Sequence, residues 1–128
     1  MSKDIRIKKG LDIKLVGNAE KNTTKVSLSS VYALQPKDFH GITPKLVAKE
    51  GSEVKAGDTL FYSKSDERIL FPSPVSGKVV EVIRGERRRV LTIKIAADAN
   101  QVYTDFGKKD ASKMSAEEVK THLLSSGC

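Results

Sequence analysis

The stretch Phe71-Pro72-Ser73-Pro74-Val75-Ser76-Gly77-Lys78-Val79-Val80 decides how this sequence folds. Proline lacks a backbone N–H and has a fixed φ, so the stretch is neither a helix interior nor a central strand. Gly77 suits a turn position with positive φ, and β-branched residues follow it. We therefore expect one strand to end at a rigid corner and a new strand to begin near Gly77.

Turn signals also precede this corner. Residues 47–61 contain Gly51 and Gly57 on either side of Val54, which indicates two turns around one apolar anchor. The charged residues 63–68 then separate two apolar segments and predict a hairpin tip. Strands this short, with turns this close together, are typical of a small all-β barrel or sandwich.

A second hairpin is expected after the corner. The β-branched segments 79–83 and 90–95 flank the charged stretch Arg84-Gly85-Glu86-Arg87-Arg88-Arg89, which contains one glycine. In the N-terminal part, weaker alternation over residues 5–16 predicts two short strands. A clearer alternation over residues 24–28 predicts a half-buried strand.

Length and composition limit the class of protein. A chain of 128 residues allows one domain with a modest core and an appendage, and its 38% apolar and 30% charged residues are ordinary for a soluble protein. The single cysteine, Cys128, excludes an internal disulfide and fits a reducing compartment. No segment is apolar enough to span a bilayer and the first residues lack a signal-peptide core, so we expect a cytoplasmic protein.

The net charge of +7 favours an anionic partner, but not a nucleic acid. Apart from Arg84 and Arg87–Arg89, the basic residues are scattered, and no aromatic residues interleave with them as single-strand binding requires. A solvated hairpin tip is the simplest explanation of the arginines. Contact with a protein or a membrane surface is the functional alternative.

The sequence changes character after the second hairpin. Ser115 and Glu118 predict a capping box, and Gly127 suits the end of the helix that would follow. An isolated helix of this length is only marginally stable, so it needs a packing partner. We expect residues 1–97 to form the β domain, and residues 98–128 to form a linker and a short helix that begins a further, truncated domain.

The glycine and proline framework, with Gly51, Gly57, Pro72, Pro74 and Gly77, resembles the biotinyl/lipoyl family and its barrel-sandwich hybrid relatives. That resemblance implies a mainly β fold of two small antiparallel sheets, here with a short C-terminal helix. Longer pieces resemble the A subunit of the bacterial Na+-translocating NADH:quinone oxidoreductases, namely Ile5–Asp12, Asp38–Gly41 with Pro44, Arg84–Arg88 and Leu123–Gly127.

The second resemblance implies the N-terminal domain of a peripheral subunit on the cytoplasmic side of the bacterial inner membrane. Such a domain would have no catalytic residue and no redox cofactor of its own, because the other subunits of the complex use NADH and flavins. It would serve assembly of the complex. Arg84, Arg87, Arg88 and Arg89 are the candidate contacts to anionic lipid or to an acidic subunit surface.

Ubiquinone is the candidate ligand that this resemblance implies, with Leu34, Phe39 and His40 nearest to it. Phe39 is suited to stack on a quinone ring, and His40 is suited to hydrogen-bond a carbonyl oxygen. The simpler interpretation is that Phe39 plugs the edge of the barrel while His40 is exposed.

A covalent carrier of a lipoyl or biotinyl group is the main alternative, with Lys64 at a hairpin tip as its lysine. The lipoyl pattern, counted back from the prolines, places Asp66 at that position, and no Met-Lys-Met sequence occurs, so a solvated lysine is the simpler interpretation. A third alternative is a related electron-transport protein with cysteine clusters beyond Cys128. No metal site is expected, because His40 and His122 lie far apart in the sequence.

Overall fold

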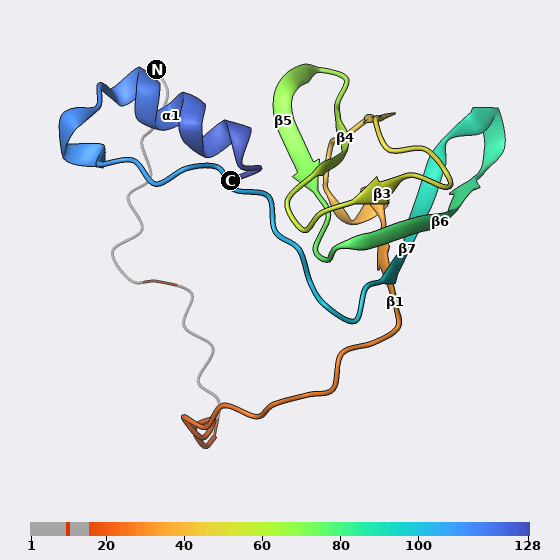
Figure 1. Cartoon of the computed structure of the whole chain (residues 1–128), viewed down its shortest axis with the longest axis horizontal. Helices are drawn as coiled ribbons and strands as arrows, with labels where there is room; N and C mark the ends of the chain where they lie inside the picture. The colour runs from red at the N-terminus through yellow and green to blue at the C-terminus, as the bar shows by residue number, and fades with distance from the viewer. Residues whose placement is uncertain (1–9, 11–15) are drawn as a thin grey trace.

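Seven strands form two antiparallel sheets in the computed structural model, which describes residue 10 and residues 16–128 (Figure 1). One sheet has the order β1-β7-β6-β3 and the other has the order β2-β4-β5. The strands are β1 (Val31–Leu34), β2 (Pro44–Leu46), β3 (Glu53–Val54), β4 (Thr59–Ser63), β5 (Asp66–Pro72), β6 (Gly77–Arg84) and β7 (Val90–Ala97). A short helix, α1 (Ala116–Ser125), follows them, so the mainly β prediction with a C-terminal helix is confirmed.

The predicted corner lies between the end of β5 and the start of β6. Ser73 and Ser76 are buried there, and the Ser73 hydroxyl donates to the Val75 carbonyl oxygen over 2.6 Å. Gly77 has a φ of +154°, and a Cβ atom at this position would lie only 1.9 Å from the carbonyl oxygen of Ala96. Only glycine therefore lets β6 begin this close to β7.

The two turns upstream are fastened to the corner and to the start of β6 by backbone hydrogen bonds. The N–H of Gly51 donates to the Val79 carbonyl oxygen at 2.8 Å, and the N–H of Gly57 donates to that of Ser73 at 2.9 Å. Between these turns, Val54 is buried, as the sequence predicted for the apolar anchor. The glycine turns and the proline corner are therefore one unit of structure, although about twenty residues separate them in the sequence.

Register shifts in both sheets decide which apolar residues enter the core. Leu60 and Phe61 are neighbours in β4, yet both are fully buried, because the pairing with β5 shifts between Thr59 and Phe61. A shift in β6 between Val79 and Glu81 similarly leaves Val80 half exposed next to the fully buried Val79. The core consists of Ala48, Val54, Leu60, Phe61, Phe71, Val75, Val79, Val82, Val90, Ile93 and Ile95.

The chain stays on the β sheets for several residues after β7. The Gln101 side-chain oxygen accepts from the N–H of Ser76 at 2.7 Å, and the N–H of Val102 donates to the Ser76 hydroxyl at 2.9 Å. Tyr103 then forms an isolated parallel bridge with Ala56. These contacts satisfy the polar groups of the buried serine, while the domain boundary expected after residue 97 stays a prediction.

The capping box predicted for the C-terminal helix is confirmed. The Ser115 hydroxyl accepts from the N–H of Glu118 at 3.3 Å, and the Glu118 carboxylate accepts from the N–H of Ser115 at 2.7 Å. α1 contacts β5, and the chain turns at Gly127 against the ring of Pro72. The helix thus has at least part of its packing partner within this chain.

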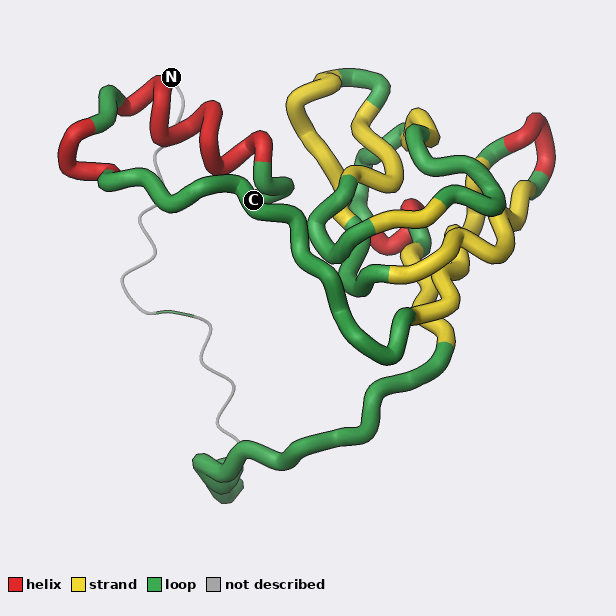
Figure 2. Tube along the Cα trace, viewed as in Figure 1, coloured by secondary structure: helices red, strands yellow, loops and turns green. Residues whose placement is uncertain are grey.

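The strand predicted over residues 24–28 is wrong. Val26 and Leu28 are 81% and 69% exposed, and the chain runs through this segment as an extended loop (Figure 2). Alternation makes a strand only where a sheet edge is available, and β1 already occupies the outer edge of β7. The two strands predicted over residues 5–16 fall on residues 1–9 and 11–15, which lie outside the described residues.

Replacing Gly77 with alanine should destabilise the fold more than the same change at Gly51. Both have positive φ, but a Cβ at Gly51 meets nothing within 4 Å, whereas at Gly77 it meets backbone. We expect Gly51→Ala to cost about 1 kcal/mol and Gly77→Ala at least about 3 kcal/mol. Urea unfolding monitored by circular dichroism measures both, and equal losses would contradict the close approach at Gly77.

Candidate functional site

Three phenylalanines form a cluster beside β5. The rings of Phe61 and Phe71 are stacked with centroids 4.4 Å apart, and Phe39 packs against Phe71 at 4.6 Å. Phe39 follows a 3-10 turn over Pro36–Asp38, and its N–H donates to the Pro36 carbonyl oxygen. Because Phe39 is 37% exposed, it both covers the core and presents part of its ring to the surface.

An apolar groove of about 220 Å³ lies next to this cluster. Its lining combines β1, the segment after the 3-10 turn, β5 and the end of α1, and includes Leu34, Phe39, Ile69, Phe71, Leu124 and Cys128. The structure therefore brings Leu34 and Phe39, two of the predicted quinone residues, to one groove. His40 is exposed and is not among the lining residues.

Sequence reasoning did not connect α1 to this groove. Leu124 and Cys128 join the lining only because the end of the helix packs on β5, more than fifty residues away in the sequence. A partial signal was present, since Leu124 is one of few apolar residues in a helix that needs a packing partner.

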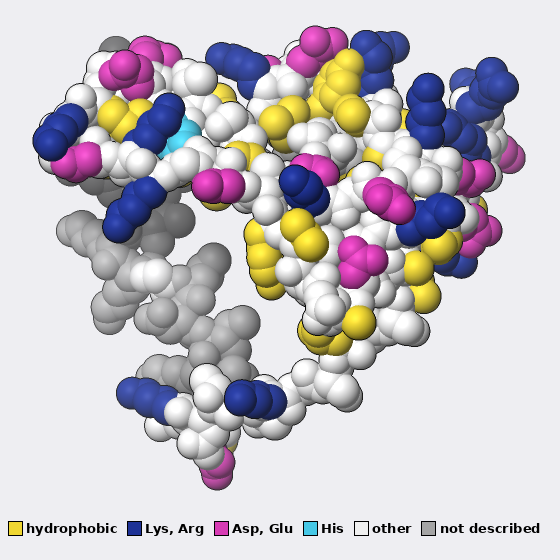
Figure 3. Space-filling view, viewed as in Figure 1, with side chains coloured by type: hydrophobic (Ala, Val, Ile, Leu, Met, Phe, Trp, Pro, Cys, Tyr) yellow, Lys and Arg dark blue, Asp and Glu magenta, His cyan; other side chains and the backbone are white. Residues whose placement is uncertain are grey.

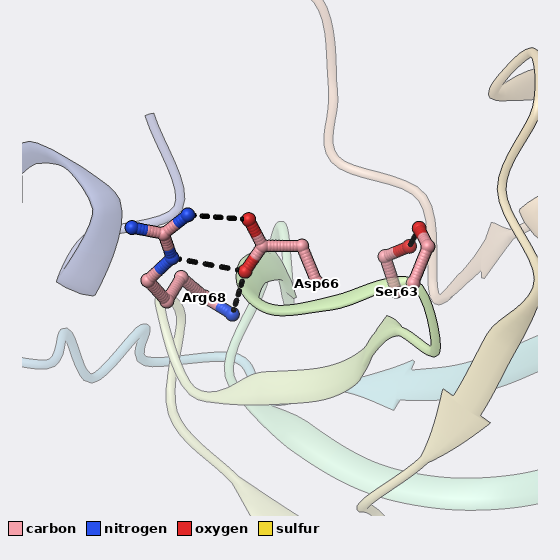
Figure 4. A network of polar contacts seen from close by, with 4 residues as sticks. Ser63, Asp66 and Arg68 are labelled. Atoms are coloured by element: carbon pink, nitrogen blue, oxygen red, sulfur yellow. Dashed lines mark hydrogen bonds and ion pairs between the residues drawn. The ribbon is translucent and has the colours of Figure 1, made fainter.

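The predicted carrier lysine lies at the tip of the β4–β5 hairpin. Lys64 is exposed, and its N–H donates to the Thr43 carbonyl oxygen at 2.8 Å. Two residues on, Asp66 accepts from the Arg68 guanidinium at 2.7 and 3.0 Å and from the Arg68 N–H at 3.0 Å (Figure 4). These hydrogen bonds lower the pKa of Asp66 to about 2, so this carboxylate is charged and is held in its contact with Arg68.

The predicted arginines take part in a second groove, which we call the basic groove, of about 510 Å³. Arg84, Arg87, Arg88 and Arg89 line it from the β6–β7 hairpin. Two lysines of the other sheet complete its ring of cations, Lys45 in β2 and Lys64 after β4. Figure 3 shows Lys and Arg side chains gathered at this end of the molecule. Sequence reasoning missed Lys45, since nothing in its local pattern places it beside the arginines.

No group of three or more His, Cys, Asp or Glu side chains within residue 10 and residues 16–128 is arranged to hold a metal ion. His40 and His122 belong to different parts of the structure. His40 lies in the turn after β1, whereas His122 lies in α1. Among the helices of the described segments, none combines the length and the apolar character needed to cross a membrane.

The two curled sheets, joined through a proline corner, define a barrel-sandwich hybrid domain. A family model described as the NqrA N-terminal barrel-sandwich hybrid domain matches residues 5–98. The chain belongs to this family, which confirms the fold and the resemblance that the sequence motifs indicated.

Relatives that share one name support this assignment. Proteins named as the A subunit of Na(+)-translocating NADH-quinone reductase are 32% identical in Marinomonas sp. (strain MWYL1) and 33% identical in Yersinia pestis, over 95% and 96% of this chain. The corresponding protein of Neisseria meningitidis serogroup A is 33% identical over 96% of the chain. In each case the chain spans about 28% of the length of the relative.

Replacing Arg68 with glutamine should return the Asp66 pKa from about 2 towards its ordinary value of about 3.9. A lowered folded-state pKa gives stability that is present above about pH 3.9 and is lost as the pH falls through about 2. The measurement is the NMR titration of the Asp66 carboxyl carbon. Equal midpoints in the two proteins would show that the guanidinium does not hold the carboxylate in its charged form.

Proposed function

We propose that this chain is the N-terminal domain of the A subunit of a Na+-translocating NADH:quinone reductase, and that it serves complex assembly and lies beside the quinone. The family match and the names of the relatives support the first part. The apolar groove with Leu34 and Phe39 in its lining is the observation that supports the second part.

The size of the apolar groove favours contact with part of a quinone. At about 220 Å³ it is smaller than the roughly 300–1,000 Å³ typical of sites that enclose a drug-sized ligand. It would accept the substituted ring, with the exposed part of Phe39 against it, while the isoprenoid tail would lie elsewhere. The domain would therefore supply one wall of the quinone site, and the rest of the complex would supply the other walls.

The remaining parts of the proposal follow from the same assignment. The domain would bind no redox cofactor, and NADH and flavins would be used by the other subunits of the complex. It would lie at the cytoplasmic side of the bacterial inner membrane as a peripheral part of the assembly. His40 would reach a quinone carbonyl oxygen only if its exposed side chain turned towards the groove.

The single thiol of the chain gives a direct test, because Cys128 lines the apolar groove. A fully ring-substituted short-chain ubiquinone should slow alkylation of Cys128 by a small maleimide. Phe39→Ala should reduce this protection about five- to tenfold, as expected for the loss of a ring contact of about 1–1.4 kcal/mol. Alkylation followed by intact-protein mass spectrometry gives the rates.

Tyr103→Ala is the matched control, since it removes another exposed aromatic ring that does not line the groove. Protection should be unchanged in this variant. The quinone part of the proposal fails if Phe39→Ala keeps full protection, or if the quinone never slows alkylation in the parent chain.

The carrier role is a second candidate, favoured by the exposed position of Lys64 at a tight hairpin tip. It predicts that the gene product purified from its native host carries a lipoyl or biotinyl mass on Lys64, and that Lys64→Arg abolishes the adduct. Intact-mass and peptide-mass analysis decide this, and an unmodified Lys64 would exclude the carrier role. Lys49→Arg, which also changes an exposed lysine, is the control.

A further inference from the structure

The basic groove concentrates charge that the described residues do not neutralise. All six of its cationic residues are exposed. Of these six, only Lys45 lies within 4.0 Å of a carboxylate of the described residues, that of Glu67 at 3.7 Å. Glu86 lies in the same hairpin but forms no ion pair with another described residue. Like charges held close together repel each other, so this surface favours an anion.

The turn that presents the arginines has an unusual backbone. Arg87 and Arg88 have φ angles of 52° and 62°, in the left-handed region that asparagine and glycine adopt far more readily than arginine. The Arg84 guanidinium donates to the Arg88 carbonyl oxygen at 3.3 Å and helps to hold the turn. Arginine therefore occupies two positions that suit asparagine or glycine, and both of these residues line the basic groove.

The lining of the basic groove argues against two kinds of anionic partner. No aromatic side chain of the described residues lines it, so it lacks the aromatic platform on which successive bases of a single strand stack. The outer strand β2 at this groove is only three residues long and begins at Pro44, so it is a poor template for an acidic peptide that adds a strand. The partly exposed apolar residues in the lining, Ile42 and Leu46, suit the glycerol and first methylenes of a lipid.

We propose that the basic groove binds the phosphate groups of anionic phospholipids and holds this domain against a membrane surface. Several long, exposed cations around one hollow suit a surface of many similar headgroups better than one tightly oriented ligand. This deepens the proposed function, since it rests on a peripheral domain lying beside a membrane complex. It is tested on the 128-residue chain alone, so that it can fail separately.

The test is co-sedimentation of the chain with phosphatidylcholine vesicles that contain phosphatidylglycerol. Arg87→Asn with Arg88→Asn removes two charges and places a residue that tolerates positive φ at each position, so urea unfolding should show no loss of stability. Binding should weaken about 30-fold, because each cation near an anionic surface contributes about 1 kcal/mol. Raising the ionic strength from about 0.1 M to about 1 M should release the parent chain.

Lys108→Asn with Lys109→Asn is the matched control, because it removes the same charge from two adjacent exposed residues outside the basic groove. This variant should bind nearly as well as the parent chain. Equal losses in the two double variants, or equal binding to vesicles of phosphatidylcholine alone, would overturn the proposal.

Two further outcomes would assign the basic groove to another anion. Displacement from the vesicles by inorganic phosphate or pyrophosphate at constant ionic strength would point to a soluble phosphate compound. The second outcome is that the arginine changes leave vesicle binding unchanged but cause salt-sensitive loss of the other subunits from the full-length protein. That result would point to an acidic protein surface in the complex. No vesicle binding, with Cys128 still protected by quinone, would reject the lipid contact and leave the proposed function standing.

Discussion

The close approach of two backbones at Gly77 is the constraint on which the rest of the structure depends. The start of β6 lies so near the carbonyl of Ala96 that no side chain fits between them. The corner before it contributes few N–H donors, since Pro72 and Pro74 have none. Its buried Ser76 instead receives hydrogen bonds from the segment after β7, including the N–H of Val102. One junction therefore fixes the corner, the central hairpin and the path of the chain beyond the sheets.

The two candidate sites follow from this junction in different ways. β5 leads into the corner and presents Phe71, on which Phe39 and the end of α1 converge to form the apolar groove. β6 and β7 lead away from the corner and end in the arginine turn. Lys45 and Lys64 come from the second sheet, so the basic groove exists only because both sheets curl towards the same end of the molecule. The same fold thus presents the apolar groove and the basic groove at separate places.

Local patterns predicted the elements well where a residue type has a strong backbone preference. Prolines and glycines placed the corner and its flanking turns, and Ser115 with Glu118 placed the start of α1. Alternation alone was less reliable. It predicted a strand through Val26 and Leu28, which are exposed, because a strand needs a neighbouring edge that alternation cannot supply. It also could not foresee that a register shift buries both Leu60 and Phe61.

The sequence by itself determined the family, the mainly β fold, the two hairpins and the capped helix, because each is recognised from short motifs whose residues are close together in the chain. It also singled out Phe39, Lys64 and the four arginines as candidates. Only the tertiary structure decided which of them share a surface. Leu34 and Phe39 meet the end of α1, whereas His40 stays outside the groove, and Lys45 and Lys64 join the arginines. Such groupings depend on strand register and on sheet curvature, which are set by contacts between residues far apart in the sequence.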